Sequence, residues 1–162
     1  MNPNDDKPND KRADRRALSS GARLYAVQAL YQMEAAGQSA ERVTREFELF
    51  RLGADDEDGQ SLSADETLFN RVVDGAVTWQ SRIDQATDRG LVAKWPIDRI
   101  DPVLRALFRA AGAELVTPQT PPKVVITEYV RLAEAFFPNG REPKFVNAVL
   151  DHVARELRPE AF

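Results

Sequence analysis

The chain contains no cysteine and only one histidine among its 162 residues. Without cysteine there is no disulfide framework, no thiolate metal site and no cysteine nucleophile. One histidine cannot build a multi-histidine metal site. No apolar run approaches the roughly 18 residues that a membrane-spanning helix needs, and the polar N-terminus lacks the apolar core of a secretory signal. We therefore predict a cytoplasmic protein that has no membrane segment and holds no cofactor or metal.

The common sequence signatures of enzymes are also missing. The chain has no GxGxxG dinucleotide-binding pattern, no P-loop and no serine in a nucleophile elbow. Carboxylates pair at Asp55–Asp56 and at Asp65–Glu66, where a solvated loop and a helix start explain them without catalysis. His152 falls late in the last predicted helix, where a surface position is the simpler interpretation. We therefore predict that the protein is not an enzyme.

The overall charge limits what kind of nucleic-acid binding is possible. The net charge is −4, whereas proteins that bind nucleic acid through bulk charge are basic. Histone-like, non-specific binding is thus disfavoured, and a nucleic-acid site has to come from local placement of charge. Apolar residues make up 43% of the chain, which is enough to bury a real core.

Apolar residues recur at three- and four-residue steps along most of the chain, which is typical of amphipathic helices. No segment of useful length alternates with period two, so we predict an all-α fold. A polar tail, expected to be flexible, covers residues 1–14, and the first helix is expected to start near Ser19 or Ser20. A long helix is expected from a cap at Ser63 to near Gly90, and short helices near Leu91–Arg99.

Some inward-facing positions are predicted from the same periodicity. In the second helix these include Phe50, and in the long third helix they include Trp79. The helix that begins after Thr120 is expected to bury one apolar face, formed by Ile126, Val130, Ala133 and Phe137. The acidic segment Asp55–Asp58 reads as a loop that lacks the spacing of a calcium-binding loop.

Basic residues gather before the first predicted helix. Lys11, Arg12, Arg15, Arg16 and Arg23 lie close together in the sequence. Arg12, Arg15 and Arg16 share one face if that helix extends towards the N-terminus. Such arginines can grip phosphate oxygens. A solubilising tail explains the same cluster equally well.

The last predicted helix offers a second candidate site. Lys144, Asn147 and Asp151 fall on one polar stripe, and Phe145 lies beside it. An aromatic ring next to an ammonium and an amide is suited to stacking a base and contacting phosphate. On pattern alone, packing of Phe145 into the core is the favoured alternative.

Four segments together resemble one family. They are KFVNAVLD at 144–151, AVQALY at 26–31, FRAAGAEL at 108–115 and KVVITE at 123–128. In order and spacing they are similar to the NusB family of bacterial antitermination factors, from about Arg15 to Arg158. The resemblance implies about seven helices in two small bundles over residues 15–158. It also implies binding of the single-stranded RNA element boxA together with ribosomal protein NusE, in the RNA polymerase antitermination complex of ribosomal RNA operons.

The resemblance also implies which residues contact RNA. In the family the RNA lies along the basic N-terminal arm, the first helix and the start of the last helix. Carried over, these positions are Arg16, Arg23, Gln28, Tyr31, Lys144, Phe145 and Asn147. We add Arg12 and Arg15 from the basic cluster. Arg141 is also included, because it stands just before the signature where family members can carry an acidic residue.

Departures from the family pattern leave alternatives open. Residues 19–22 (SSGA) dilute the family's compact arginine run. Related helical domains occur at the N-terminus of ribosomal RNA cytosine methyltransferases, but this chain is expected to have no room for a methyl-donor domain. A protein-interaction scaffold without RNA contact is a further alternative. Some family members form homodimers, and the sequence does not decide whether this chain does.

Overall fold

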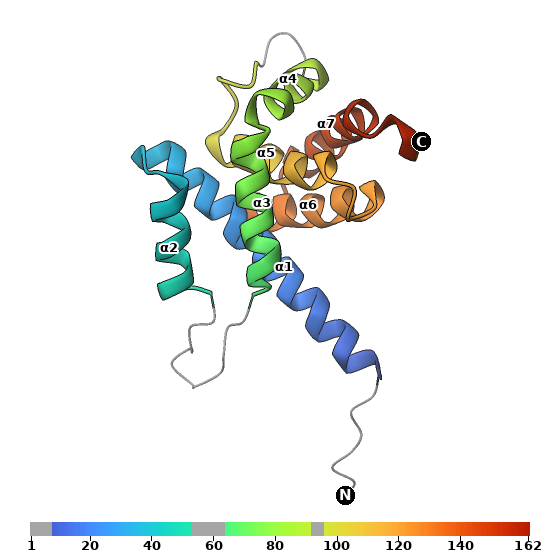
Figure 1. Cartoon of the computed structure of the whole chain (residues 1–162). Helices are drawn as coiled ribbons and strands as arrows, with labels where there is room; N and C mark the ends of the chain where they lie inside the picture. Colours follow the sequence, from blue (N-terminus) through green and yellow to red (C-terminus); the bar gives the residue numbers. More distant parts are fainter. Residues whose placement is uncertain (1–7, 53–63, 92–95) are drawn as a thin grey trace, which may run out of the picture.

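A computed structural model of the chain describes residues 8–52, 64–91 and 96–162 (Figure 1). The described residues form seven α-helices and a short 3₁₀ helix, with no strand. These are α1 (Pro8–Ala36), α2 (Ala40–Phe50), α3 (Glu66–Thr78), α4 (Gln80–Gly90), α5 (Pro102–Val116), α6 (Pro122–Phe136), α7 (Glu142–Leu157) and η1 (Pro159–Ala161). The predicted all-α class is confirmed.

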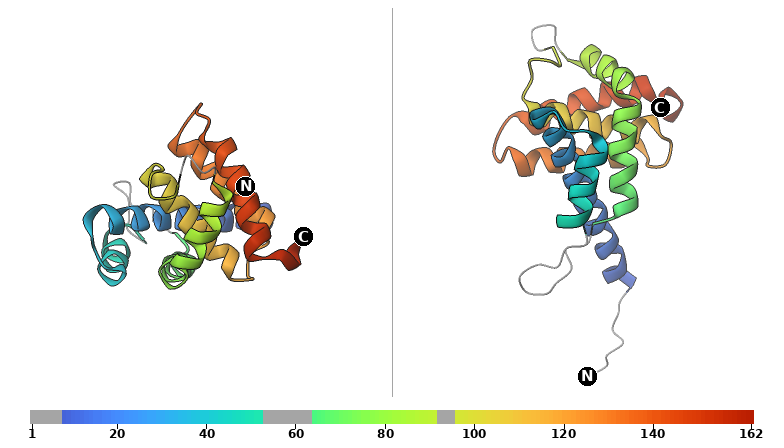
Figure 2. Two further views of the ribbon diagram at one scale, coloured as in Figure 1. Left: turned by 90° about the horizontal axis from the view of Figure 1, so that it is seen from above. Right: turned by 60° about the vertical axis from the view of Figure 1, so that its left-hand side comes forward.

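Helix α5 forms the centre of the molecule. Its residues from Ala106 to Leu115 are buried all round except Arg109, as expected for a helix surrounded by others. On one side it packs on α1 and α3, which together with α2 make one small bundle. On the other side it packs on α4, α6 and α7, which make a second bundle. The two bundles therefore share one apolar core, and Figure 2 shows them from two further directions.

The predicted start of the first helix is wrong. Helix α1 begins at Pro8, so the predicted tail boundary at Asp14 falls inside it, while residues 1–7 lie outside the described residues. Proline fits the first helical position, and the Lys, Arg and Ala residues that follow have high helix propensity. The first turns of α1 project beyond the rest of the described chain (Figures 1 and 2).

The long third helix is also corrected. The predicted cap Ser63 and the acidic segment Asp55–Asp58 lie outside the described residues. Helix α3 is capped by Asp65, whose side chain accepts a hydrogen bond from the Leu68 N–H. The expected continuous helix divides at Trp79, which is 42% exposed rather than buried. Phe50, predicted to face inward, is 74% exposed.

The buried face of α6 differs by one position from the prediction. Val125, Tyr129 and Ala133 are buried, while Ile126, Val130 and Phe137 are only half-buried against the core. Ala133 was predicted correctly, and the other three predicted residues belong to a half-buried stripe beside the buried one. Two apolar stripes occur because α6 packs on both α5 and α7.

Two remaining predictions concern the connections and the membrane. Between Leu91 and Arg99, where short helices were expected, the described residues 96–99 form a turn. None of the helices in the described ranges is both long enough and apolar enough to cross a membrane.

Candidate nucleic-acid interface

The first turn of α7 carries the aromatic and basic residues singled out in the sequence. Pro143 occupies the start of the helix, and Val146, Val149 and Val153 bury its apolar stripe. With that stripe turned inward, Lys144 and Asn147 are exposed, as is Arg141 just before the helix.

Phe145 serves both the core and the surface. Its ring packs edge-on against the buried Phe108, with 6.0 Å between centroids and 70° between planes. It is nevertheless only half-buried, and it lines a depression of about 290 Å³ together with Arg99, Leu104 and Arg141. The core alternative and the RNA alternative are therefore compatible for this residue.

A second depression lies beside Gln28 and Tyr31 on α1. It has a volume of about 390 Å³ and includes Val103 at the start of α5 and Phe136 at the end of α6. Tyr31 is 42% exposed, so its ring can be reached from solvent. Gln28 Oε1 accepts a hydrogen bond of 3.0 Å from Arg51 Nη1.

Arg51 is a basic residue of this depression that the sequence did not single out. It stands at the end of α2, where its guanidinium lies 4.8 Å from the ring centroid of Phe47. Arg51 and Gln28 are 23 positions apart, so no local sequence pattern predicts their contact.

Of the predicted arginines on the arm, three are exposed. Arg12, Arg15 and Arg16 lie on α1 and face solvent. Arg15 and Arg16 also line a groove whose opposite wall is α6. Because α1 begins at Pro8, all three arginines lie within the helix. Their three- and four-residue spacing then places them on one face.

Arg23 is placed differently from the prediction, and this is a correction. It is only 6% exposed, and its guanidinium donates two hydrogen bonds to the Glu114 carboxylate, of 2.9 Å from Nε and 3.0 Å from Nη2. Burial alone would lower the pKa of Arg23, but the hydrogen bonds and charge of Glu114 outweigh it and raise that pKa. Arg23 therefore joins α1 to α5, and its guanidinium is engaged by Glu114 rather than exposed on the arm as predicted.

Tyr129 lies beside this buried pair. It is fully buried, and burial, followed by the charge of Glu114, raises the pKa of its hydroxyl well above the usual value. The three side chains come from α1, α5 and α6, so these helices meet at one buried polar cluster.

Six of the remaining predicted residues line three hollows. Gln28 and Tyr31 line one, Arg141 and Phe145 line another, and Arg15 and Arg16 line the groove. The depression at Tyr31 and the depression at Phe145 flank the start of α5, one containing Val103 and the other Leu104. Helix α6 contributes Phe136 to the Tyr31 depression. It also contributes Arg131 to the groove that Arg15 and Arg16 line. We call the surface formed by these two depressions and the groove the basic-aromatic face. Stacking and phosphate contact are the interactions it offers a nucleic acid.

Comparison with known proteins identifies a family. The NusB family model matches residues 20–155. The transcription antitermination protein NusB of Maricaulis maris is 45% identical over 158 residues, which cover 97% of this chain and 96% of that protein. The protein of the same name from Granulibacter bethesdensis is 46% identical over 149 residues, covering 88% of this chain and 91% of its own.

Solved structures agree with the family match. NusB of T. maritima superposes with a TM-score of 0.69 at 27% identity, over 88% of this chain and 95% of that one. A chain from a complex of the antitermination factors NusB and NusE with double-stranded RNA has a TM-score of 0.66 at 26% identity. That match covers 85% of this chain and 96% of the other.

Proposed function

The chain belongs to the NusB family, and we propose that it is a transcription antitermination factor that binds RNA together with ribosomal protein NusE. The observation that carries this proposal is coverage, since relatives that are antitermination proteins match over nearly their whole length. A similar solved chain stands in a complex with NusE and RNA. Such a factor acts on the nascent transcript as part of the RNA polymerase antitermination complex, which places it in the cytoplasm.

The RNA we propose is the single-stranded boxA element of ribosomal RNA operons. Sequence-specific RNA recognition relies on unstacked bases that meet aromatic side chains and hydrogen-bonding groups. Tyr31 and Phe145 offer partly exposed rings. Lys144 and Asn147 offer exposed donors on α7, the helix that carries Phe145. One base stacked on such a ring contributes about 1–3 kcal/mol.

The charge balance favours weak binding without the partner. If Arg12, Arg15, Arg16 and Lys144 each meet a phosphate, log K falls with log salt at a slope of roughly −3, about −0.7 for each contact. The net charge of −4 opposes this attraction at long range. We therefore expect NusE to supply further contacts and tighten the complex.

Filter binding of labelled RNA tests the proposal. The chain is titrated onto boxA, a scrambled single strand and a duplex, each with and without NusE. Preferential binding of boxA that tightens with NusE is expected. Absence of RNA binding in the presence of NusE would refute the proposal, and equal affinity with and without NusE would refute the partner's role. As a matched control, Lys144→Ala is compared with Arg82→Ala, which removes an exposed cation from α4 on a different surface.

The alternatives are less well supported. The relatives matched over nearly their full length are antitermination proteins, not enzymes, so a methyltransferase module is disfavoured. A scaffold without RNA contact predicts that NusE binds while no RNA does, which the same assay detects.

A further inference from the structure

We propose that α6 supplies a phosphate-binding wall opposite the arginines of α1, so that the RNA backbone lies in the groove between these two helices. The inference rests on the proposed RNA-binding function and adds residues to it. Neither Lys123 nor Arg131 was a candidate from the sequence, because each is an isolated charge on a helix far from the N-terminal arm.

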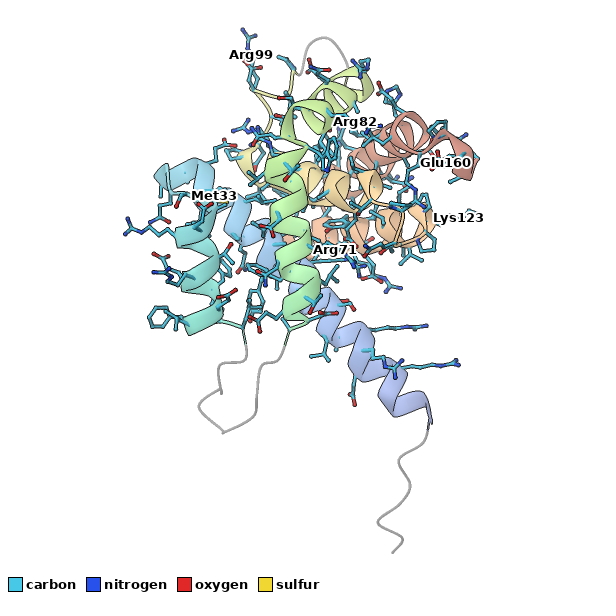
Figure 3. All side chains as sticks on the ribbon, in the orientation of Figure 1. Met33, Arg71, Arg82, Arg99, Lys123 and Glu160 are labelled. Carbon is cyan, nitrogen blue, oxygen red and sulfur yellow. The ribbon has the colours of Figure 1, made fainter. Side chains whose placement is uncertain are left out.

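The first observation is the shape of the groove. It has a volume of about 510 Å³ and lies between residues 15–23 of α1 and residues 123–131 of α6. On α1 it is lined by Arg15, Arg16 and Ser19. On α6 it is lined by Lys123 and Arg131, with Thr127 between them. Nitrogen-tipped side chains at the start of α1 project to the same side of the molecule as the labelled Lys123 (Figure 3).

The second observation is the register of the α6 wall. Lys123, Thr127 and Arg131 follow one another at four-residue steps, which places them on one face of the helix. The two cations are about 12 Å apart along the helix axis, at 1.5 Å for each residue. A row of this length suits a chain of phosphates better than one isolated anion.

The third observation is the balance of charge. Five cationic residues line the groove on an acidic protein: Arg15, Arg16, Lys123 and Arg131, and the largely buried Arg23. Glu128 is the only carboxylate among the described residues that line it. Its charge is partly met already, because Ser20 Oγ donates to it at 3.2 Å and Arg131 Nη1 lies 3.5 Å away. At the floor, Arg23 is neutralised by Glu114. The groove is therefore a local positive site, which an acidic protein needs if it is to bind RNA.

An RNA backbone is the occupant that this arrangement favours. Lysine and arginine side chains that contact phosphates fix the position of the strand without reading its bases. A strand whose bases meet Tyr31 can continue into the groove, because α6 borders both the groove and the Tyr31 depression.

The test is the salt dependence of RNA binding by a Lys123→Ala/Arg131→Ala double variant of the full chain, measured with and without NusE. The control double variant is Arg45→Ala/Arg82→Ala, which removes the same charge from exposed positions on α2 and α4. We expect the α6 variant to bind boxA and scrambled RNA about tenfold more weakly, with a salt slope reduced by about 1.4. The control should change little.

A variant with the opposite sign sharpens the test. Glu128→Gln removes a carboxylate that lines the groove while it keeps an acceptor for Ser20, so RNA affinity should rise severalfold. Circular dichroism of each variant verifies that the helices are retained.

Several results would overturn the inference. Unchanged affinity and slope in the α6 variant, alongside a loss in Lys144→Ala, would remove the groove from the RNA path and leave the proposed function standing. An equal loss of RNA affinity in the control variant would mean that the overall charge of the protein, and not the groove, determines binding. A loss seen only with NusE would make the groove a protein contact. Failure of the unaltered chain to bind RNA even with NusE would overturn both proposals.

Discussion

Breaking the buried pair between Arg23 and Glu114 should destabilise the protein strongly. The two side chains are 7% and 1% exposed, and Arg23→Ala leaves the Glu114 carboxylate buried without its two hydrogen bonds. Removing one partner of a buried ion pair typically costs about 3–5 kcal/mol. Domains of this size are stable by only about 5–15 kcal/mol, so the loss is a large share of the total.

Thermal and urea unfolding followed by circular dichroism measure this cost. For a chain of this length each kcal/mol lowers Tm by roughly 2–4 °C, so Arg23→Ala should lower it by about 6–20 °C. Arg16→Ala is the matched control, because that arginine is exposed on the same helix, and its Tm should hardly change.

A second variant distinguishes a structural role of Arg23 from a contact between Arg23 and RNA. A double variant, Arg23→Met/Glu114→Met, replaces both charges by apolar side chains and should recover much of the stability. At temperatures where it is folded, the double variant should bind RNA like the unaltered chain. If Arg23→Ala keeps its Tm and loses RNA affinity, then Arg23 contacts RNA and the interpretation of the pair as purely structural is refuted.

Three other substitutions probe the site and the core. Phe145→Ala should weaken boxA binding by about 1–3 kcal/mol while the helical circular dichroism signal persists; collapse of that signal would make the ring a core residue only. Gly112→Ala should cost about 1–3 kcal/mol in urea unfolding, because its new Cβ would overlap Ile83 Cγ2; unchanged stability would refute close packing of α4 on α5. Glu34→Gln should lower the free energy of unfolding at neutral pH. As the pH falls, that free energy should decrease less in the variant than in the unaltered chain. Hydrogen bonding to Arg105 lowers the pKa of Glu34, so its contribution is present above the unfolded pKa of about 4.3 and is lost as pH falls through the folded one. Equal pH profiles would contradict this.

Local periodicity predicted those parts of the fold in which one helix has one buried face. In α5 the apolar residues recur at three- and four-residue steps, and Leu104, Leu107, Ala111 and Leu115 are all buried. Asp101 caps this helix by accepting a hydrogen bond from the Val103 N–H. In α6 periodicity failed because the helix packs against two neighbours and two apolar stripes compete. The start of α1 was misplaced because a good cap at Ser19 outweighed, in our reading, the helix-forming residues before it.

The candidate site was harder to predict, because its charges depend on partners distant in the sequence. Arg23 resembles the other arginines of the arm, and only Glu114, which lies 91 positions away, removes it from the surface. Lys123 and Arg131 look like ordinary solvated charges on α6 until the fold brings α1 alongside. The sequence therefore predicts a site on the arm and at the start of α7, whereas the proposal for α6 depends on the structure.

The diluted arginine run has a structural reason. Residues 19–22, which dilute the arginine run that the resemblance implies, lie where α1 is enclosed by the rest of the molecule. Ala22 is buried, Gly21 lies against Ala64, and Ser20 donates to Glu128. Long cationic side chains have little space on that turn. The arginines of this chain stand one turn earlier, at Arg15 and Arg16, where α1 emerges from the body but still borders the groove. Because a helical turn advances only about 5.4 Å, charge moved by one turn stays within reach of the same strand. Loss of the compact run is thus compatible with RNA binding, provided that cations on the facing helix complete the set.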